Sequence, residues 1–259
     1  ERQRHVVVVQ DAFTSYYDAA VVVDLCELTQ RLGFTPWLAP FKPNGKAQHV
    51  LGFLGTFERT ARANAAMLSQ LAATGVELIG VDPSMTLAYR AEYAKAIGEP
   101  VAVSLPQEWL ARHLESLPQL EPAAKSDRWA LLPHCTERTN APRSILDWQR
   151  VSRRLGVELV VLPSGCCGMA GLYGHERANR ARSEAIYQLS WANYLEDPGY
   201  TGRIVATGYS CRTQVEIVDA VDLMHPVQLL LNRIKAKPVG RPSRAASPKS
   251  ADAVHHEEY

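Results

Sequence analysis

The chain has 259 residues, of which 46% are hydrophobic and 21% charged, and its formal net charge is +1. This composition is ordinary for a globular protein, and the small net charge argues against nucleic acid or an anionic membrane surface as a partner. No apolar run approaches the roughly 18 residues that a membrane-spanning helix needs, and there is no signal-peptide pattern. We therefore expect a cytoplasmic protein, with peripheral membrane association as the alternative.

The first half of the chain is predicted to alternate strands with helices. Apolar runs predict strands over residues 5–10, 35–40 and 76–81, and helical apolar spacing predicts helices over 19–32 and 58–73. Glycine follows shortly after both helices, which is typical of a helix end. Strands that alternate with helices favour a mainly parallel sheet covered on both faces.

The second half is predicted to repeat this plan. Strands are expected over residues 129–132, 157–162 and 203–207, with helices over 144–155 and 176–195. The predicted fold class is therefore α/β, with two pseudosymmetric repeats that each contain a small parallel sheet flanked by helices.

Matching residues at one constant spacing support this internal duplication. The pairs are Leu32 with Leu155, Gly33 with Gly156, Pro40 with Pro163, Gly45 with Gly168 and Ala47 with Ala170. We assign a first repeat to residues 1–120, a second repeat to 128–236 and a disordered tail to 237–259, where Pro, Ser, Lys and Arg accumulate.

Four of the five cysteines lie in the second half, each shortly after a predicted strand. Cys135 follows the first strand, Cys166 and Cys167 follow the second between Gly165 and Gly168, and Cys211 follows the third. Loops beyond the carboxyl ends of parallel strands converge, so we expect these four sulfurs to meet. Cys26 stands apart in a predicted helix and is interpreted as a buried structural thiol.

Four thiolates are the usual complement of a [4Fe–4S] cluster and also of a structural zinc ion. Adjacent cysteines point in different directions, which suits a cluster of several irons better than a single ion. We therefore favour a cluster bound by Cys135, Cys166, Cys167 and Cys211. The alternatives are zinc in a structural or docking module without a redox role, a thiol–disulfide oxidoreductase using Cys166 and Cys167, and four incidental thiols.

The first half lacks these ligands. By the repeat alignment, Ala12, Pro43, Asn44 and Met85 occupy the places of the four cysteines. Lys42 and Lys46 flank the corresponding loop, where they either offset the charge of a cluster or an anionic substrate or are ordinary solvated lysines. The first repeat is therefore not expected to bind metal through thiolates.

Other polar and aromatic residues near the cysteines have open roles. The candidate roles of His134 are a metal ligand, a hydrogen-bond donor to sulfur and a loop histidine that hydrogen-bonds its surroundings. The candidate roles of His175 and Glu176 are proton transfer and stabilisation of a helix start. Tyr209 stacks on a cofactor or packs, and His225 with Pro226 is expected to begin the last helix.

The run from Leu162 to Gly171, with His134-Cys135 before it and Ser210-Cys211 after it, resembles the CCG-type cysteine-rich domain. This domain occurs in one of the subunits of heterodisulfide reductase and in the iron–sulfur subunit of glycolate oxidase. The run from Gly171 to Glu176 is similar to the carboxyl-terminal part of flavin- and iron–sulfur-dependent FAD-linked oxidases of the bacterial D-2-hydroxyglutarate dehydrogenase type.

This resemblance implies an electron-transfer module of a flavin-dependent 2-hydroxyacid dehydrogenase. FAD and a ferredoxin-like domain would lie on a preceding part of the same or a partner polypeptide, with a redox acceptor beyond, and this segment would lack the flavin active site. The chain begins at Glu1 without methionine, which we interpret as a processed or shortened polypeptide. Gly208 stands where relatives usually have a cysteine, which argues against the five-cysteine cluster and its disulfide-cleaving chemistry.

Overall fold

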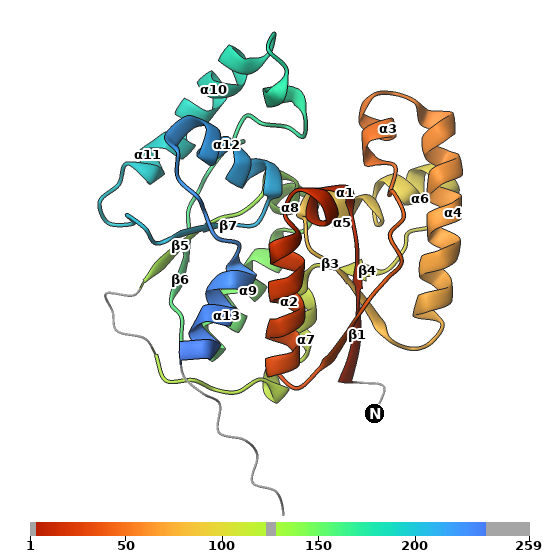
Figure 1. The fold of residues 1–259 in the computed structure, drawn as a ribbon, viewed down its shortest axis with the longest axis horizontal. Coiled ribbons are helices and arrows are strands. Elements are labelled where there is room, and N and C mark those ends of the chain that lie inside the picture. The colour runs from red at the N-terminus through yellow and green to blue at the C-terminus, as the bar shows by residue number, and fades with distance from the viewer. Residues whose placement is uncertain (1–3, 123–127, 237–259) are drawn as a thin grey trace, which may run out of the picture.

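The computed structural model describes residues 4–122 and 128–236, which form two parallel β-sheets with helices around them (Figure 1). The first sheet has the strand order β2-β1-β3-β4. Its strands are β1 (His5–Val9), β2 (Thr35–Leu38), β3 (Glu77–Gly80) and β4 (Val103–Ser104). The central strand β1 is almost entirely buried, in keeping with its run of four valines.

The second sheet has the order β6-β5-β7, which matches the arrangement of the first three strands of the first sheet. Its strands are β5 (Trp129–Leu132), β6 (Leu159–Val161) and β7 (Ile204–Ala206). All pairings in both sheets are parallel. The predicted fold class is therefore confirmed, and each predicted strand overlaps an observed one.

Helices cross over between the strands of both halves. In the first half they are α1 (Ala12–Tyr16), α2 (Ala19–Arg31), α3 (Lys46–Val50), α4 (Leu54–Ala72), α5 (Pro83–Ala88), α6 (Glu92–Ile97) and α7 (Pro106–Arg112). In the second half they are α8 (Cys135–Asn140), α9 (Pro142–Arg154), α10 (Arg180–Gln188), α11 (Trp191–Leu195), α12 (Tyr209–Asp219) and α13 (Pro226–Ala236). Residues 4–122 and 128–236 also contain the short 3-10 helices η2 (Leu114–Ser116) and η4 (Tyr173–His175).

The predicted ends of two helices and the predicted start of the last helix are confirmed. Leu32 and Leu155 both end their helices, and the glycines after them both have positive φ, 89° at Gly33 and 73° at Gly156. These are the conformations that glycine adopts with least strain. The last helix begins at Pro226 as expected, with the amide of Val227 donating to His225 Nδ1 at 3.1 Å.

The single helix predicted over residues 176–195 is wrong. The chain forms α10 and α11 instead and breaks at Ser190, where φ is −150° and ψ is −42°. Ser190 Oγ accepts a hydrogen bond from the Gly165 amide at 3.1 Å, and Trp191 Nε1 donates to the Gly165 carbonyl at 3.1 Å. This long-range contact with the cysteine loop overrides the local helical spacing.

The last helix of each half packs against the first long helix of the other half. α13 lies along α2, and α7 lies along α9 (Figure 1). Apolar residues of both halves share one core cluster, which includes Leu25 and Trp109 from the first half and Trp148 and Leu230 from the second. Burial of this shared apolar surface holds the two halves together.

The division into repeats over residues 1–120 and 128–236 stays a prediction, although each range contains one of the two sheets. The tail predicted over 237–259 lies outside the described residues. Among residues 4–122 and 128–236, no helix combines the length and the apolar character needed to cross a membrane.

Candidate metal centre

The cysteines lie at the carboxyl ends of the three strands of the second sheet. Cys135 is the first residue of α8 after β5, the Cys166-Cys167 pair lies in the loop after β6, and Cys211 lies in the first turn of α12 after β7. Cys167 and Cys211 are 3% and 1% exposed, whereas Cys135 and Cys166 are half-buried. The structure thus brings the four predicted residues to one edge of the sheet.

The thiols are hydrogen-bond neighbours in the order Cys135, Cys166, Cys167, Cys211. Cys166 accepts from the thiols of Cys135 and Cys167 and from the Gly168 amide at 3.3 Å, and these donors lower the pKa of Cys166 far below its usual range. The pKa of Cys135 is raised by the bond to Cys166 and then by burial, and the pKa of Cys167 is raised by the bonds to Cys166 and Cys211 and then by burial. Hydrogen-bond donors of three residues thus converge on Cys166 Sγ, and the thiolate is the form of cysteine that binds metals.

Glycine is required by space at two places in the site. A side chain at Gly168 would put its Cβ 2.1 Å from the backbone oxygen of Ser183, and φ is 91° there. At Gly208 a Cβ would lie 2.2 Å from His134 Cδ2 and 3.1 Å from Cys211 Sγ. A side chain at Gly208 would therefore not fit without displacing the imidazole.

His134 is held as a neutral cap beside the cysteines. Its Nδ1 accepts a hydrogen bond from the Thr136 amide at 3.1 Å at the start of α8, so its hydrogen is assigned to Nε2. The side chain is buried, which lowers the pKa of His134, and the ring packs on Gly208. Of the roles left open by the sequence, the structure shows the hydrogen-bonded loop histidine.

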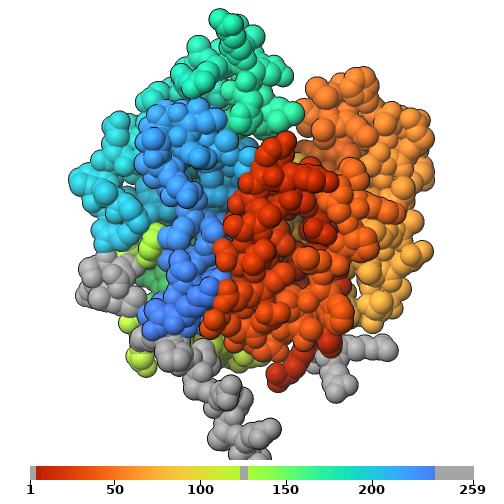
Figure 2. Space-filling model, viewed as in Figure 1, coloured from red at the N-terminus to blue at the C-terminus, as the bar shows by residue number. Residues whose placement is uncertain are grey.

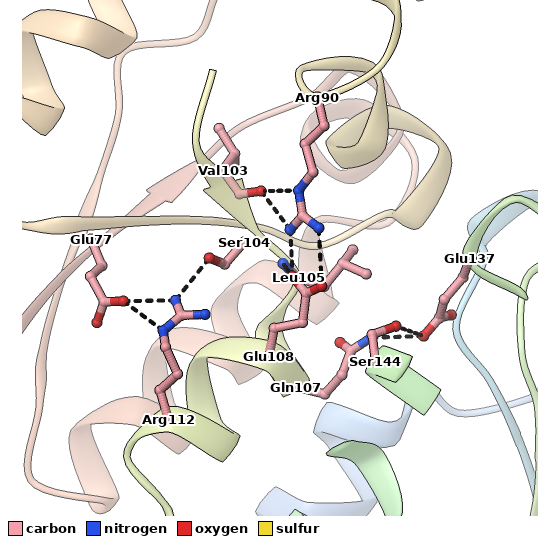
Figure 3. A network of polar contacts seen from close by, with 10 residues as sticks. All are labelled: Glu77, Arg90, Val103, Ser104, Leu105, Gln107, Glu108, Arg112, Glu137 and Ser144. Atoms are coloured by element: carbon pink, nitrogen blue, oxygen red, sulfur yellow. Dashed lines mark hydrogen bonds and ion pairs between the residues drawn. The ribbon is translucent and has the colours of Figure 1, made fainter. Parts of the chain in front are cut away.

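A buried carboxyl group, which the sequence pattern does not reveal, is hydrogen-bonded to the residues around the cysteines. Glu137 is 0% exposed, and its two oxygens accept from Gln107 Nε2 at 2.7 Å, from Ser144 Oγ at 3.2 Å and from Thr207 Oγ1 at 2.7 Å. Thr207 Oγ1 in turn accepts from the His134 amide at 2.9 Å. Burial raises the pKa of Glu137 to about 7. Figure 3 shows Gln107 and Ser144 pointing at this carboxyl from α7 and α9.

In the first half, residues at two of the positions that match the cysteines also contact each other, although they are not thiols. Asn44 Nδ2 donates to the carbonyl oxygen of Met85 at 3.2 Å and lies 3.4 Å from its Sδ. These two residues match Cys167 and Cys211 in the repeat alignment, and they meet in space as those cysteines do. The repeat thus predicts which positions converge, and the residue types decide whether a metal can bind.

Two buried carboxyl groups follow β1 and β3 in the first half. Asp11 caps α1 through the amides of Phe13 and Thr14, and Asp82 caps α5. Burial, and then the charge of Asp82, raises the pKa of Asp11 to about 7. Asp82 Oδ2 also accepts from the Tyr209 amide at 3.0 Å, which joins the first half to the helix that carries Cys211.

The other candidate residues have local roles. Lys46 pairs with Glu92, and Lys42 Nζ donates to the Ala63 carbonyl at 3.5 Å. His175 and Glu176 are exposed on and beside η4 and begin no long helix. The ring of Tyr209 lies 5.0 Å from Phe13 and 6.0 Å from Tyr17, so the aromatic contacts of Tyr209 are with the first half.

A groove of about 730 Å³ lies away from the cysteines, between β4 and the helices α7 and α9. Three arginines line it or its rim, and each guanidinium is already paired with a carboxylate. The pairs are Arg90 with Glu108, Arg112 with Glu77 and Arg150 with Asp147 (Figure 3 shows the first two). This groove offers no unpaired arginine to an anionic ligand.

Across residues 4–122 and 128–236, no three His, Cys, Asp or Glu side chains are grouped as ligands of a single ion. The thiols of Cys135, Cys166, Cys167 and Cys211 are nevertheless neighbours of one another. Four thiolates are the usual complement of a structural zinc ion and of a [4Fe–4S] cluster, so this donor set fits either group.

No family model matches the chain. It is 47% identical to a D-2-hydroxyglutarate dehydrogenase of Escherichia coli K12 over 238 residues, and 46% identical to one of Haemophilus influenzae over 246 residues. Each match covers 91% of this chain. The chain spans about a quarter of the length of these relatives, 23% and 24%, and corresponds to their carboxyl-terminal part.

A more distant relative is one of the subunits of the anaerobic glycerol-3-phosphate dehydrogenase of Escherichia coli K12. It is 26% identical over 233 residues, which cover 84% of this chain and 56% of that subunit. All three relatives are dehydrogenases by name, in agreement with the prediction that the chain is part of an oxidoreductase.

Proposed function

We propose that this chain is the iron–sulfur-binding electron-transfer module of a flavin-dependent 2-hydroxyacid dehydrogenase that acts on D-2-hydroxyglutarate or a similar acid. The observation that carries the proposal is the meeting of four thiols from three strand-end loops. Cys135, Cys166, Cys167 and Cys211 would hold one [4Fe–4S] cluster, which supplies one-electron transfer when bound.

The residues around the thiols are suited to tuning such a group. The Gly168 amide donates to Cys166 Sγ, and hydrogen bonds to sulfur are one of the levers that set a cluster's reduction potential. Cys167 and Cys211 belong to an apolar cluster with Met169, Tyr187 and Trp191, which keeps water from this side of the site. The half-buried Cys135 and Cys166 leave the other side open to an electron partner.

The two classes of relative support a transferable module. In one class the matching stretch is about a quarter of a D-2-hydroxyglutarate dehydrogenase, and in the other it is about half of a separate subunit of a glycerol-3-phosphate dehydrogenase. A segment that recurs with dehydrogenases of different named substrates is better suited to passing electrons than to recognising a substrate. The flavin, the ferredoxin-like domain and the hydroxyacid follow from the family resemblance.

The test is to purify the chain without oxygen and measure iron, acid-labile sulfide, zinc and the visible spectrum. We expect about four iron and four sulfide per chain. Cys167→Ser should lose them, whereas Cys26→Ser, which changes the thiol of α2, should keep them. One zinc and no sulfide would leave a structural module instead. No metal, with free-thiol counts that change on reduction, would favour thiol–disulfide chemistry at Cys166 and Cys167.

A further inference from the structure

The turn between α3 and α4 exposes large apolar side chains in close succession. Val50, Leu51, Phe53 and Leu54 are 68%, 67%, 61% and 59% exposed. No Asp, Glu, Lys or Arg occurs between Lys46 and Glu58. Surface segments are normally rich in charge, so an uncharged exposed segment of this kind indicates an interaction site. We call these four residues the α3–α4 corner.

The corner has a defined backbone. The amide of Leu51 donates to the Ala47 carbonyl at 3.0 Å, and the amide of Phe53 donates to the Gln48 carbonyl at 2.9 Å. The backbone thus holds the apolar side chains outward instead of letting them fold back onto the core. A surface that is ordered before it binds loses less conformational entropy on docking.

The helix that leads to the corner follows β2, just as the cysteines follow the strands of the second sheet. Asn44, just before α3, donates to the Met85 carbonyl of α5, and α5 packs against α8, which begins at Cys135. Tyr16 and Tyr17 of α1 are 67% and 71% exposed. Figure 1 shows α3 at the upper right and α1 nearer the middle of the view, and Figure 2 shows their surfaces in orange and red at these places.

The lengths of the relatives indicate what covers this surface. The match spans 91% of this chain but only 23% of the Escherichia coli dehydrogenase, so about three quarters of that polypeptide lies outside it. An aromatic and aliphatic surface without charged residues is typical of the core of a lasting interface, whereas a mobile carrier is usually met by a more polar face.

We propose that the α3–α4 corner, with Tyr16 and Tyr17, is the surface on which the remaining part of the same dehydrogenase polypeptide docks beside the cysteine site. The inference rests on the proposed function, because it places this chain in a longer enzyme. It adds the contact surface through which electrons would reach the cysteines.

Side-chain footprinting with hydroxyl radicals tests the docking directly, in the full-length dehydrogenase and in this chain alone. We expect oxidation of Leu51, Phe53 and Tyr17 to fall strongly in the full-length protein. Leu38 and Leu189, which are 55% and 79% exposed elsewhere, should keep their oxidation rates. Equal oxidation of the corner in both proteins would overturn the proposal. Protection that appears in this chain alone as its concentration rises would also overturn it, since a second copy would then cover the corner.

A pair of surface variants in the full-length enzyme tests what the contact does. Leu51→Asp combined with Phe53→Asp should retain iron and the reduction of flavin by the hydroxyacid, and should slow the passage of electrons to the iron site in a rapid-mixing experiment. Leu189→Asp is the matched control and should not slow it. Equal transfer rates in the two variants would refute the docking role. Absence of iron from every protein would instead refute the proposed function, and the footprint would still report on docking.

Discussion

The folded chain should lose stability as the pH rises because Asp11 ionises in a buried position. Replacing Asp11 with asparagine should remove most of this loss. Burial and the charge of Asp82 raise the pKa of Asp11 from 3.8 to about 7 in the folded chain. The folded state therefore binds more protons than the unfolded state between these values, so stability falls as the pH rises through this window and levels off above it. The full shift corresponds to about 4 kcal/mol, and more than half of it is lost between pH 5 and pH 8.

Asparagine is a suitable replacement because it caps helices about as well as aspartate. Its side-chain oxygen can still accept from the amides of Phe13 and Thr14, as Asp11 Oδ1 does at 2.8 Å and 3.0 Å. The assay is urea unfolding at several values between pH 5 and pH 8, on proteins prepared without iron. Between pH 5 and pH 8, the unfolding free energy of Asp11→Asn relative to the unaltered chain should rise by about 3 kcal/mol.

A matched control comes from Asp197, whose carboxylate accepts from the Gly199 amide in a surface loop. The curve of Asp197→Asn should run parallel to that of the unaltered chain. If the Asp11→Asn curve also runs parallel over this range, then Asp11 is ionised in the folded chain and the reasoning from burial fails.

Two further predictions concern the surroundings of the cysteines. Gly208→Ala should reduce the iron content, because its methyl group would overlap the ring of His134. The control is Gly55→Ala in α4, where a methyl group meets nothing within 4 Å. This control should keep the iron and add up to about 1 kcal/mol of stability. Trp191→Phe should cost about 1 kcal/mol more in urea unfolding than Trp109→Phe, since both rings are fully buried but only the Trp191 N–H has a hydrogen-bond partner. Equal losses from the two tryptophans would mean that the bond to the cysteine loop contributes nothing.

The fold was largely predictable because each half repeats one pattern of apolar strands and longer helices. The helices of five to seven residues, α1, α3, α5, α6, α7 and α8, were missed because a helix of this length has little periodicity of its own, and the longer α12 was missed as well. A capping pattern was nevertheless readable at α5, where Asp82 follows the strand predicted over residues 76–81 and Pro83 begins the helix. The break at Ser190 was not readable, because it depends on a contact with Gly165 that lies far away in the sequence.

The meeting of the cysteines was predictable from their places after parallel strands. The hydrogen-bond network of Glu137 beside these cysteines was not predictable. Glu137 lies in a polar run that looks exposed, and only its bonds to Gln107 and Thr207, both distant in sequence, bring it inside. The order of hydrogen bonds among the thiols likewise depends on side-chain directions that spacing does not determine.

The reciprocal packing of α13 on α2 and of α7 on α9 limits how small a working fragment can be. A designer who wanted the shortest piece with all four cysteines would choose residues 128–236. That piece would leave α13 without its partner and uncover Val227, Leu230 and Ile234, which are at most 2% exposed in the whole chain. Such a fragment should aggregate or pair with a second copy of itself. The half that lacks the four-cysteine site therefore serves the other half as a built-in partner.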